Sequence, residues 1–198
     1  MLALVWIGII AIAVVAIILL VRQSQGKSLI PSSSQTGLPS LQRTVFTLQA
    51  GDIVQYEGAD WVVEGQLTYN SHGFVWMEYL LQDADQIRWL SVEEDDQVEV
   101  CWLKPVKGLE ISHTPPQQIT VADVVFQLEE SDTAQMTHLG ATLNRQAQQC
   151  RYFDYSSADG QVLSVEHWDG ETEITMGHQI RPSALILLPG DGRHVYDG

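Results

Sequence analysis

The sequence has few basic residues, and this shortage excludes one large class of function. Lysine and arginine together number 10, against 25 aspartates and glutamates, which gives a formal net charge of −15. All of the acidic residues, but only part of the basic ones, lie in residues 44–198. The phosphates of nucleic acids repel a domain of this charge. We therefore expect no nucleic-acid partner.

Cysteine is also scarce, and the residue spacings typical of metal and nucleophile sites are missing. Cys101 and Cys150 are the two cysteines, and the six histidines have no spacing that would bind zinc. Neither Ser91 nor Ser164 lies in a Gly-x-Ser-x-Gly elbow. In a cytoplasmic domain the cysteines are expected to be free thiols. The sequence thus predicts no metal site, no cofactor and no catalytic residue, and we expect the protein not to be an enzyme.

Charge is absent from one long stretch at the start of the sequence. Residues 2–21 are rich in Ile, Val, Leu and Ala and carry no charge. At about 1.5 Å per residue they would extend about 30 Å, the thickness of a bilayer core. This pattern predicts a transmembrane helix over residues 1–21. The competing interpretation is a cleaved secretory signal, but no basic residue precedes the run and no small-x-small site follows it.

Basic residues follow this apolar stretch, at Arg22, Lys27 and Arg43. Because basic flanks tend to stay in the cytoplasm, they predict a single-pass protein of the plasma (inner) membrane with its C-terminal domain in the cytoplasm. Residues 22–43 are rich in Ser, Gln, Gly and Pro and lack acidic side chains. They are predicted to be a flexible linker to an acidic domain over residues 44–198.

Helical periodicity is nearly absent from that domain, whereas strand patterns follow one another. Strands are predicted at residues 52–57, 60–69, 75–93 (a hairpin), 97–103, 121–128, 149–156, 161–167, 171–176 and 184–188. The breaks at 57–60, 70–73, 159–160 and 169–170 have the composition of hairpin turns. The least regular region is 127–145, and a short helix over 137–148 is the one helical expectation.

An internal repeat organises these strands. Tyr79 and residues 90–93 (Leu-Ser-Val-Glu) recur 73 positions later as Tyr152 and residues 163–166. The repeat covers roughly 51–103 and 121–180 and predicts two copies of one β unit. We therefore expect an all-β fold, a two-copy barrel-like or sandwich β domain preceded by a single transmembrane helix. The motif Gly51-Asp52-x-Val54-x-Tyr56, followed by Trp61, suggests an SH3-like small barrel for each half.

The hairpin over residues 75–93 has one apolar and one mixed face. If its turn is centred on Ala84-Asp85, Trp76 lies opposite Glu93 and Leu80 opposite Trp89. Met77, Tyr79, Leu81, Leu90 and Val92 then share the face that we expect in the core. The other face carries the candidate partner or ligand residues, which are Trp76, Glu78, Trp89 and Glu93.

Aromatic walls with carboxylates can hold a cation, so this mixed face is a possible ligand site. The structural alternative is an ion pair within the sheet. The repeat places Arg151 at the position equivalent to Glu78, so that Glu78 would pair with a basic residue in a two-copy sheet.

The tryptophans, glycines and glutamates of the domain resemble a known pattern. Gly51-Asp52, Tyr56, Gly58, Trp61-Val62-Val63, Gly65, Trp76-x-Glu78-Tyr79, Trp89-Leu90, Glu93, Tyr152, 163–166, Trp168 and Gly177 are similar to the uncharacterised bacterial family called domain of unknown function 4178. The resemblance implies no catalytic residue, because the family has none assigned. It also implies a setting beside small membrane proteins and spermidine-synthase-like enzymes, where family members are encoded.

These observations favour a membrane-anchored cytoplasmic β domain that acts as a binding or assembly module for another membrane-associated protein. The alternative is a polyamine- or cation-handling subunit, or an enzyme, that uses the aromatic and acidic face. A convergent polar pocket with strongly perturbed carboxylates would favour the enzyme. A flat apolar patch rimmed by charge would favour the assembly module.

Overall fold

The structure, a computed structural model, describes residues 42–143, 145 and 148–191. The described strands are β1 (Ile53–Tyr56), β2 (Ala59–Ser71), β3 (Phe74–Asp83), β4 (Gln86–Glu94), β5 (Val98–Pro105), β6 (Gln118–Val121), β7 (Val124–Gly140), β8 (Gln149–Ser157), β9 (Gln161–Trp168), β10 (Glu171–Ile180) and β11 (Ile186–Leu188), with a 3-10 turn at Pro182–Ala184. The predicted all-β class is therefore confirmed for the described residues.

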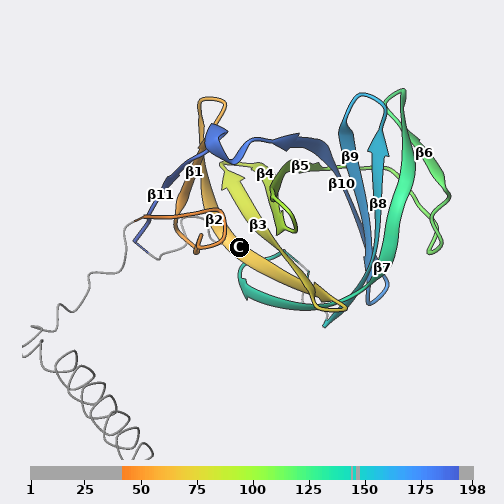
Figure 1. Ribbon diagram of the computed structural model, residues 1–198, viewed down its shortest axis with the longest axis horizontal. Helices are drawn as coiled ribbons and strands as arrows, with labels where there is room; N and C mark the ends of the chain where they lie inside the picture. Colours follow the sequence, from red (N-terminus) through yellow and green to blue (C-terminus); the bar gives the residue numbers. More distant parts are fainter. Residues whose placement is uncertain (1–41, 144, 146–147, 192–198) are drawn as a thin grey trace, which may run out of the picture. The chain divides into compact units, whose positions relative to one another are not determined.

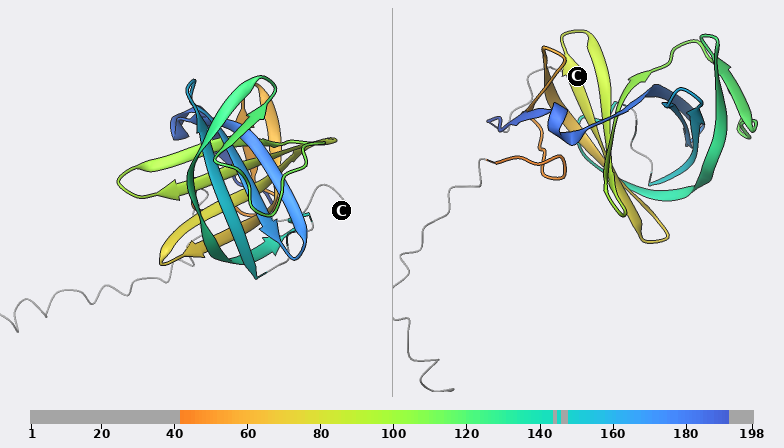
Figure 2. Two further views of the ribbon diagram at one scale, coloured as in Figure 1. Left: turned by 90° about the vertical axis from the view of Figure 1, so that its right-hand side faces the viewer. Right: turned by 45° about the horizontal axis from the view of Figure 1, so that its top comes forward.

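The strands form one sheet that closes on itself. Its order is β11-β1-β2-β3-β4-β5-β10-β9-β8-β7-β6, and β2 pairs in addition with β7. The eight strands from β2 to β7 in this order thus form a closed antiparallel barrel, which β1, β11 and β6 extend (Figures 1 and 2). Closure gives the strands at the seam a hydrogen-bonded partner in place of a free edge.

Both halves of the sequence are needed to close this barrel. The strands β2 to β5 form one four-stranded meander, and β7 to β10 form another. One seam pairs β2 with β7, from Gly65 opposite Gly140 to Asn70 opposite Gln135, and the other pairs β5 with β10. The expectation of a sandwich, or of a small barrel for each half, was therefore wrong. Each meander supplies half of the wall of one barrel.

The hairpin β3–β4 has the predicted register. Trp76 lies opposite Glu93 and Leu80 opposite Trp89, on either side of the turn at Ala84-Asp85. The outward face packs into an apolar cluster that includes Tyr79, Leu81, Leu90 and Val92 together with Val54, Trp61 and Val63. The mixed face of the hairpin therefore points into the barrel lumen.

The second hairpin, β8–β9, has a different register, and this changes which side chains are equivalent. Tyr79 pairs with Leu90 in the first hairpin, whereas Tyr152 pairs with Glu166 and not with Leu163. The odd shift of three positions reverses the face of one strand relative to the other. Tyr152 belongs to the cluster inside the lumen, and Arg151 lies on the opposite face of β8 from Tyr152.

The strand β7 replaces the helix expected near residues 137–148. It runs to Gly140, and Ala134 and Met136 alternate into the lumen cluster, which is the period of a strand. No described residue beyond Gly140 in that range is helical. The strand predicted over 121–128 spans a tight turn, because Ala122 and Asp123 both have positive φ, at 47° and 67°.

The predicted transmembrane helix at residues 1–21 lies outside the described residues, as does nearly all of the linker at 22–43. Across 42–143, 145 and 148–191, no helix has the length and apolar character needed to span a membrane. For the described residues the fold class is therefore corrected to an all-β barrel without a transmembrane helix, and the single-pass inner-membrane localisation is not carried further.

The seam between β2 and β7 leaves no room for a side chain at Gly65. A Cβ there would lie 2.0 Å from the carbonyl oxygen of Ala141. We expect Gly65→Ala to lower the free energy of unfolding by about 3 kcal/mol, since the backbone at the seam must move. Chemical denaturation measures this. Gln135→Ala, an exposed change on the same seam, should stay within about 0.5 kcal/mol of the wild type. Equal stability of the two variants would contradict a tightly closed seam.

Candidate functional site

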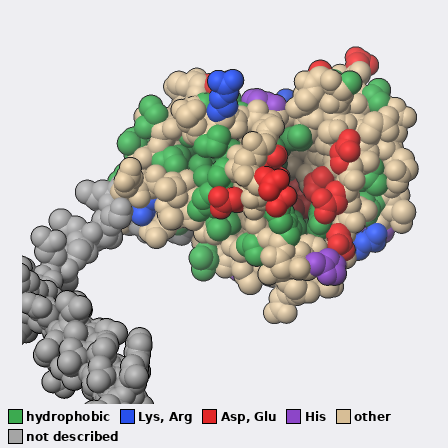
Figure 3. All heavy atoms as spheres, viewed as in Figure 1, with side chains coloured by type: hydrophobic (Ala, Val, Ile, Leu, Met, Phe, Trp, Pro, Cys, Tyr) green, Lys and Arg blue, Asp and Glu red, His purple; other side chains and the backbone are tan. Residues whose placement is uncertain are grey.

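The barrel lumen contains a cavity of about 430 Å³, lined by residues from seven of its eight strands. Figure 3 shows acidic side chains gathered around a hollow on this face of the molecule. The lining carboxylates are Glu78, Glu93, Glu99, Glu129, Glu130, Asp154 and Glu166, and the lining aromatic residues are Phe74, Trp76, Tyr152 and Tyr155. No lysine, arginine or histidine is found among the described lining residues. The volume is within the range of small-molecule sites.

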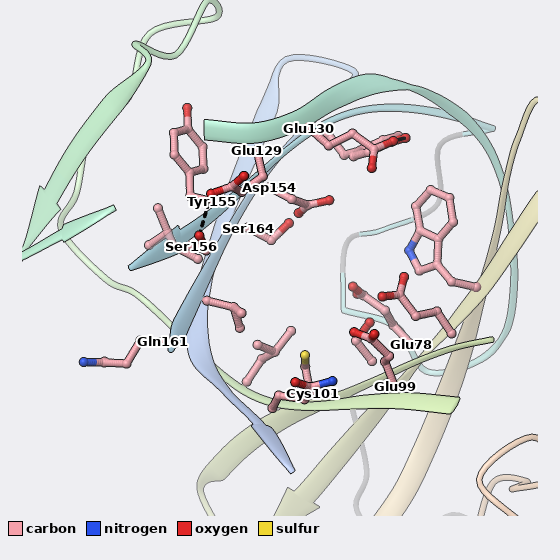
Figure 4. Close-up of a pocket in the computed structure, with 18 of the residues that line it drawn as sticks. Glu78, Glu99, Cys101, Glu129, Glu130, Asp154, Tyr155, Ser156, Gln161 and Ser164 are labelled. Atoms are coloured by element: carbon pink, nitrogen blue, oxygen red, sulfur yellow. Dashed lines mark hydrogen bonds between the residues drawn. The ribbon is translucent and has the colours of Figure 1, made fainter. Parts of the chain in front are cut away.

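Strand pairing places some of these carboxylates directly opposite one another. Glu93 on β4 faces Glu99 on β5, and Glu130 on β7 faces Asp154 on β8. Figure 4 shows Glu130 and Asp154 pointing into the cavity from one wall and Glu99 from the facing wall. Like charges in opposed positions destabilise a sheet. The lumen therefore carries an electrostatic cost that a cation would remove.

Beside this cavity, the guanidinium of Arg145 is enclosed by carboxylates. Its Nη1 lies 2.7 Å from Glu78 Oε2 and 2.9 Å from Glu166 Oε2, and its Nε lies 2.6 Å from Glu173 Oε2. Nη1 also donates to the hydroxyl of Tyr69 at 3.1 Å. The Arg145 side chain is 1 % exposed. One guanidinium thus forms ion pairs with three carboxylates, which come from β3, β9 and β10.

Tryptophan rings cover the same guanidinium. The Cζ of Arg145 lies 4.1 Å from the ring centroid of Trp89 and 4.9 Å from that of Trp168. The indole N–H of Trp89 donates to Glu173 at 2.9 Å. These contacts fill one part of the lumen with aromatic and apolar groups. The barrel interior already holds one organic cation between carboxylates and aromatic rings, namely its own arginine.

Burial raises the pKa of several carboxyl groups that line the cavity. Burial raises the pKa of Asp154 to about 7, and a hydrogen bond from Ser164 opposes this only in part. Burial raises the pKa of Glu166 to about 8, while Arg145 lowers it and Glu78 raises it. Burial also raises the pKa of Glu93, with further repulsion from Glu99. Near neutral pH the lumen therefore binds protons that exposed carboxylates would have lost.

The predicted face residues divide between two roles. Trp76, Glu78 and Glu93 line the cavity, whereas Trp89 packs over Arg145 outside the cavity lining. The basic partner of Glu78 is Arg145 and not Arg151. Sequence reasoning missed Arg145, Glu173, Asp154, Glu130 and Glu99. For Glu166 a signal existed, because the repeat aligns it with Glu93, and both line the lumen.

The positions of the carboxylates also indicate which kind of cation the cavity could bind. Within the described residues, no group of three histidine, cysteine, aspartate or glutamate side chains is arranged to hold a metal ion. The acidic groups lie instead on several walls of a cavity that aromatic rings also line. Such a lining suits an organic cation with apolar parts.

Truncation of Glu78 tests its structural role. Glu78→Ala removes one charge-assisted hydrogen bond from Arg145, which keeps Glu166 and Glu173 as partners, so we expect the free energy of unfolding to fall by about 1.5 to 3 kcal/mol. Glu99→Ala is the matched control, because Glu99 lies in the same lumen opposite Glu93 and has no ion pair among the described residues. Its stability should be unchanged or slightly raised. If urea denaturation gave Glu78→Ala the stability of the control, the ion pair with Arg145 would not hold the barrel together.

The raised pKa values also predict how stability depends on pH. Asp154 and Glu166 bind protons more tightly in the folded barrel, with pKa values of about 7 and about 8, than in the unfolded chain. Their contribution is thus complete below their unfolded pKa values of about 4 and is lost as pH rises through 7 and 8. We expect the melting temperature to fall from pH 5 to pH 8.5. Asp154→Asn should flatten this slope, and the exposed Glu94→Gln should not. A melting temperature that rises over this range would contradict protonation of the lumen.

Sequence comparisons place this chain among relatives of unstated activity. Residues 49–182 match the family described as "Domain of unknown function (DUF4178)". An uncharacterized protein of Mycobacterium bovis and one of Mycobacterium tuberculosis are each similar to this chain, with 34% identity over 151 residues, which is 72% of this chain and 72% of each relative. No solved structure matches the chain.

Proposed function

The chain belongs to the DUF4178 family, and we propose that its barrel binds a small organic cation, such as a polyamine, inside the lumen. One observation carries this proposal. Five carboxylates on the walls of the 430 Å³ cavity, Glu93, Glu99, Glu129, Glu130 and Asp154, have no basic partner among the described residues. A cationic ligand would supply the counter-charge.

The fold does not require the carboxylates that line the cavity. A barrel of this size can fill its interior with apolar side chains, as the part around Leu67 and Met136 does. Opposed carboxylates in the remaining space destabilise the protein, and natural sequences tolerate such costs at functional sites. The Arg145 cluster supports the same interpretation, because it combines carboxylates with Trp89 and Trp168 around a guanidinium.

The cavity favours this function over the assembly module expected first from the sequence. The exposed large apolar residues are divided among several elements, with Phe74 and Val75 on β3, Val125 and Leu139 on β7, and Ile186 and Leu188 on β11. A docking face for a protein partner would be supported by a continuous apolar patch. The convergent acidic pocket supports ligand binding instead.

We propose binding without a catalytic step. The described lining residues include no histidine that could act as a general base. The lining thiol of Cys101 is a poor nucleophile at neutral pH, because burial and the neighbouring Glu93 raise its pKa to about 12.

Titration calorimetry with spermidine tests the proposed site. Wild-type protein should bind spermidine and melt at a higher temperature in its presence. Glu93→Gln combined with Glu99→Gln keeps the side-chain volume but removes two facing charges, so we expect affinity to fall at least about 10-fold, which corresponds to about 1.4 kcal/mol. The matched control is Asp95→Asn with Asp96→Asn, which removes the same charge from exposed positions nearby.

The control separates lumen binding from attraction to an acidic surface. If both double variants lost affinity equally, spermidine would be binding through the overall negative charge. If the wild type neither gave a binding heat nor shifted in melting temperature, the proposed function would be wrong. A neutral aliphatic diol of similar length should produce no shift, because it cannot replace the missing counter-charge.

A further inference from the structure

Asp154 lies in a group of carboxyl groups and has no ion pair with a basic side chain of the described residues. Its strand β8 is flanked by β7, where Glu130 is directly opposite, and by β9, where Ser164 is directly opposite. Glu166 on β9 and Glu93 on β4 are the further charged groups that act on it. Each of these acidic neighbours makes ionised Asp154 less favourable. The carboxyl group of Asp154 is therefore expected to hold a proton when no cation is bound.

Glu166 stands at the boundary between the cavity and the Arg145 cluster. It lines the cavity, accepts a hydrogen bond from the hydroxyl of Tyr69 at 3.2 Å and ion-pairs with Arg145. The residue opposite it on β8 is Tyr152, and the residue opposite it on β10 is Glu173. The remaining charged neighbour is Glu78, on β3, which shares the same guanidinium. The neighbouring thiol of Cys150 stays neutral because burial raises its pKa.

The charges around Glu166 do not balance when every carboxyl group is ionised. The single guanidinium of Arg145 faces Glu78, Glu166 and Glu173, so full ionisation leaves two negative charges in excess inside the barrel. Buried charge of this kind is removed most simply by protonation. Protonation of Glu166 and Asp154 makes the lumen less negatively charged when no ligand is bound.

We propose that the lumen exchanges protons for its ligand, so that a cation entering the cavity expels the protons that Asp154 and Glu166 hold when the barrel is empty. This inference rests on the proposed function and adds how the site responds to pH. The O–H bond of the carboxyl group breaks, the proton passes to the buffer, and the carboxylate that remains pairs with the ligand's positive charge. No electron transfer or further reactant is involved.

The raised pKa values of the two groups define the pH range of the effect. With a pKa of about 7 for Asp154 and about 8 for Glu166, both groups are largely protonated at pH 6 and largely ionised at pH 9. A ligand that requires the ionised forms binds more weakly wherever a proton must leave first. If both groups must be ionised in the complex, affinity should therefore rise with pH, by about 500-fold between pH 6 and pH 8.

Calorimetry in buffers of different ionisation enthalpy measures the exchange directly. At pH 7 the observed binding heat should depend on the buffer with a slope equivalent to about 1.4 released protons. At pH 9 the slope measured with a permanently charged probe should approach zero. The probes are spermidine and hexamethonium, a bis-quaternary ammonium without a titratable group. Agreement between them at pH 7 excludes protonation changes of the ligand itself.

A variant assigns the released proton to its source. Asp154→Asn keeps the size of the side chain and cannot release a proton, so proton release at pH 7 should fall by about half of a proton. The exposed Glu94→Gln should leave it unchanged.

The possible failures are distinct. Binding of spermidine with no buffer dependence at pH 7 would overturn proton exchange and leave the cation site intact. Absence of binding in every buffer would overturn the proposed function itself. Unchanged proton release in Asp154→Asn would refute the assignment to Asp154.

Discussion

The ion pairs of Arg145 connect parts of the barrel that the chain itself keeps far apart. The residue lies in the connection between β7 and β8, and its guanidinium bonds Glu78 on β3 together with Glu166 on β9 and Glu173 on β10. These strands come from both meanders, so one side chain joins the two halves from inside. A buried guanidinium of this kind contributes to stability only while its partners are present. The packed part of the lumen surrounds Arg145. The acidic cavity is the part of the lumen that contains carboxylates without an ion pair to Arg145.

Much of the strand pattern could be predicted because it is local. Period-2 alternation and a short polar turn were enough for the register of β3–β4, and turns such as Glu57-Gly58 and Asp169-Gly170 contain a glycine that adopts positive φ. The turn at Ala122-Asp123 also has positive φ but contains no glycine, so the sequence predicted one continuous strand across it. The part of β7 beyond Leu128 was missed because residues 129–133 are all polar and show no alternation of apolar and polar side chains.

The candidate site was predictable only where it belongs to one hairpin. Trp76, Glu78 and Glu93 share a face by strand period alone, and the structure places all of them at the cavity. The partner of Glu78 could not be found in this way. The repeat pointed to Arg151, but the shifted register of β8–β9 turns that residue outward, and Arg145 reaches the lumen from an irregular connection. Which residues meet inside a barrel depends on how its seams close, and that is a property of pairings distant in sequence.

The two seams also determine when the barrel can form. They join residues 65–70 to 135–140 and residues 100–105 to 175–180, so neither meander can complete its edges before the other has been synthesised. Contacts of such long range make folding slow and leave strand edges open for a time. During that interval the carboxylates of the future lumen are exposed on both meanders, and they repel the same surfaces on other chains. The charge that shapes the cavity thus also protects the half-formed barrel from pairing with its neighbours.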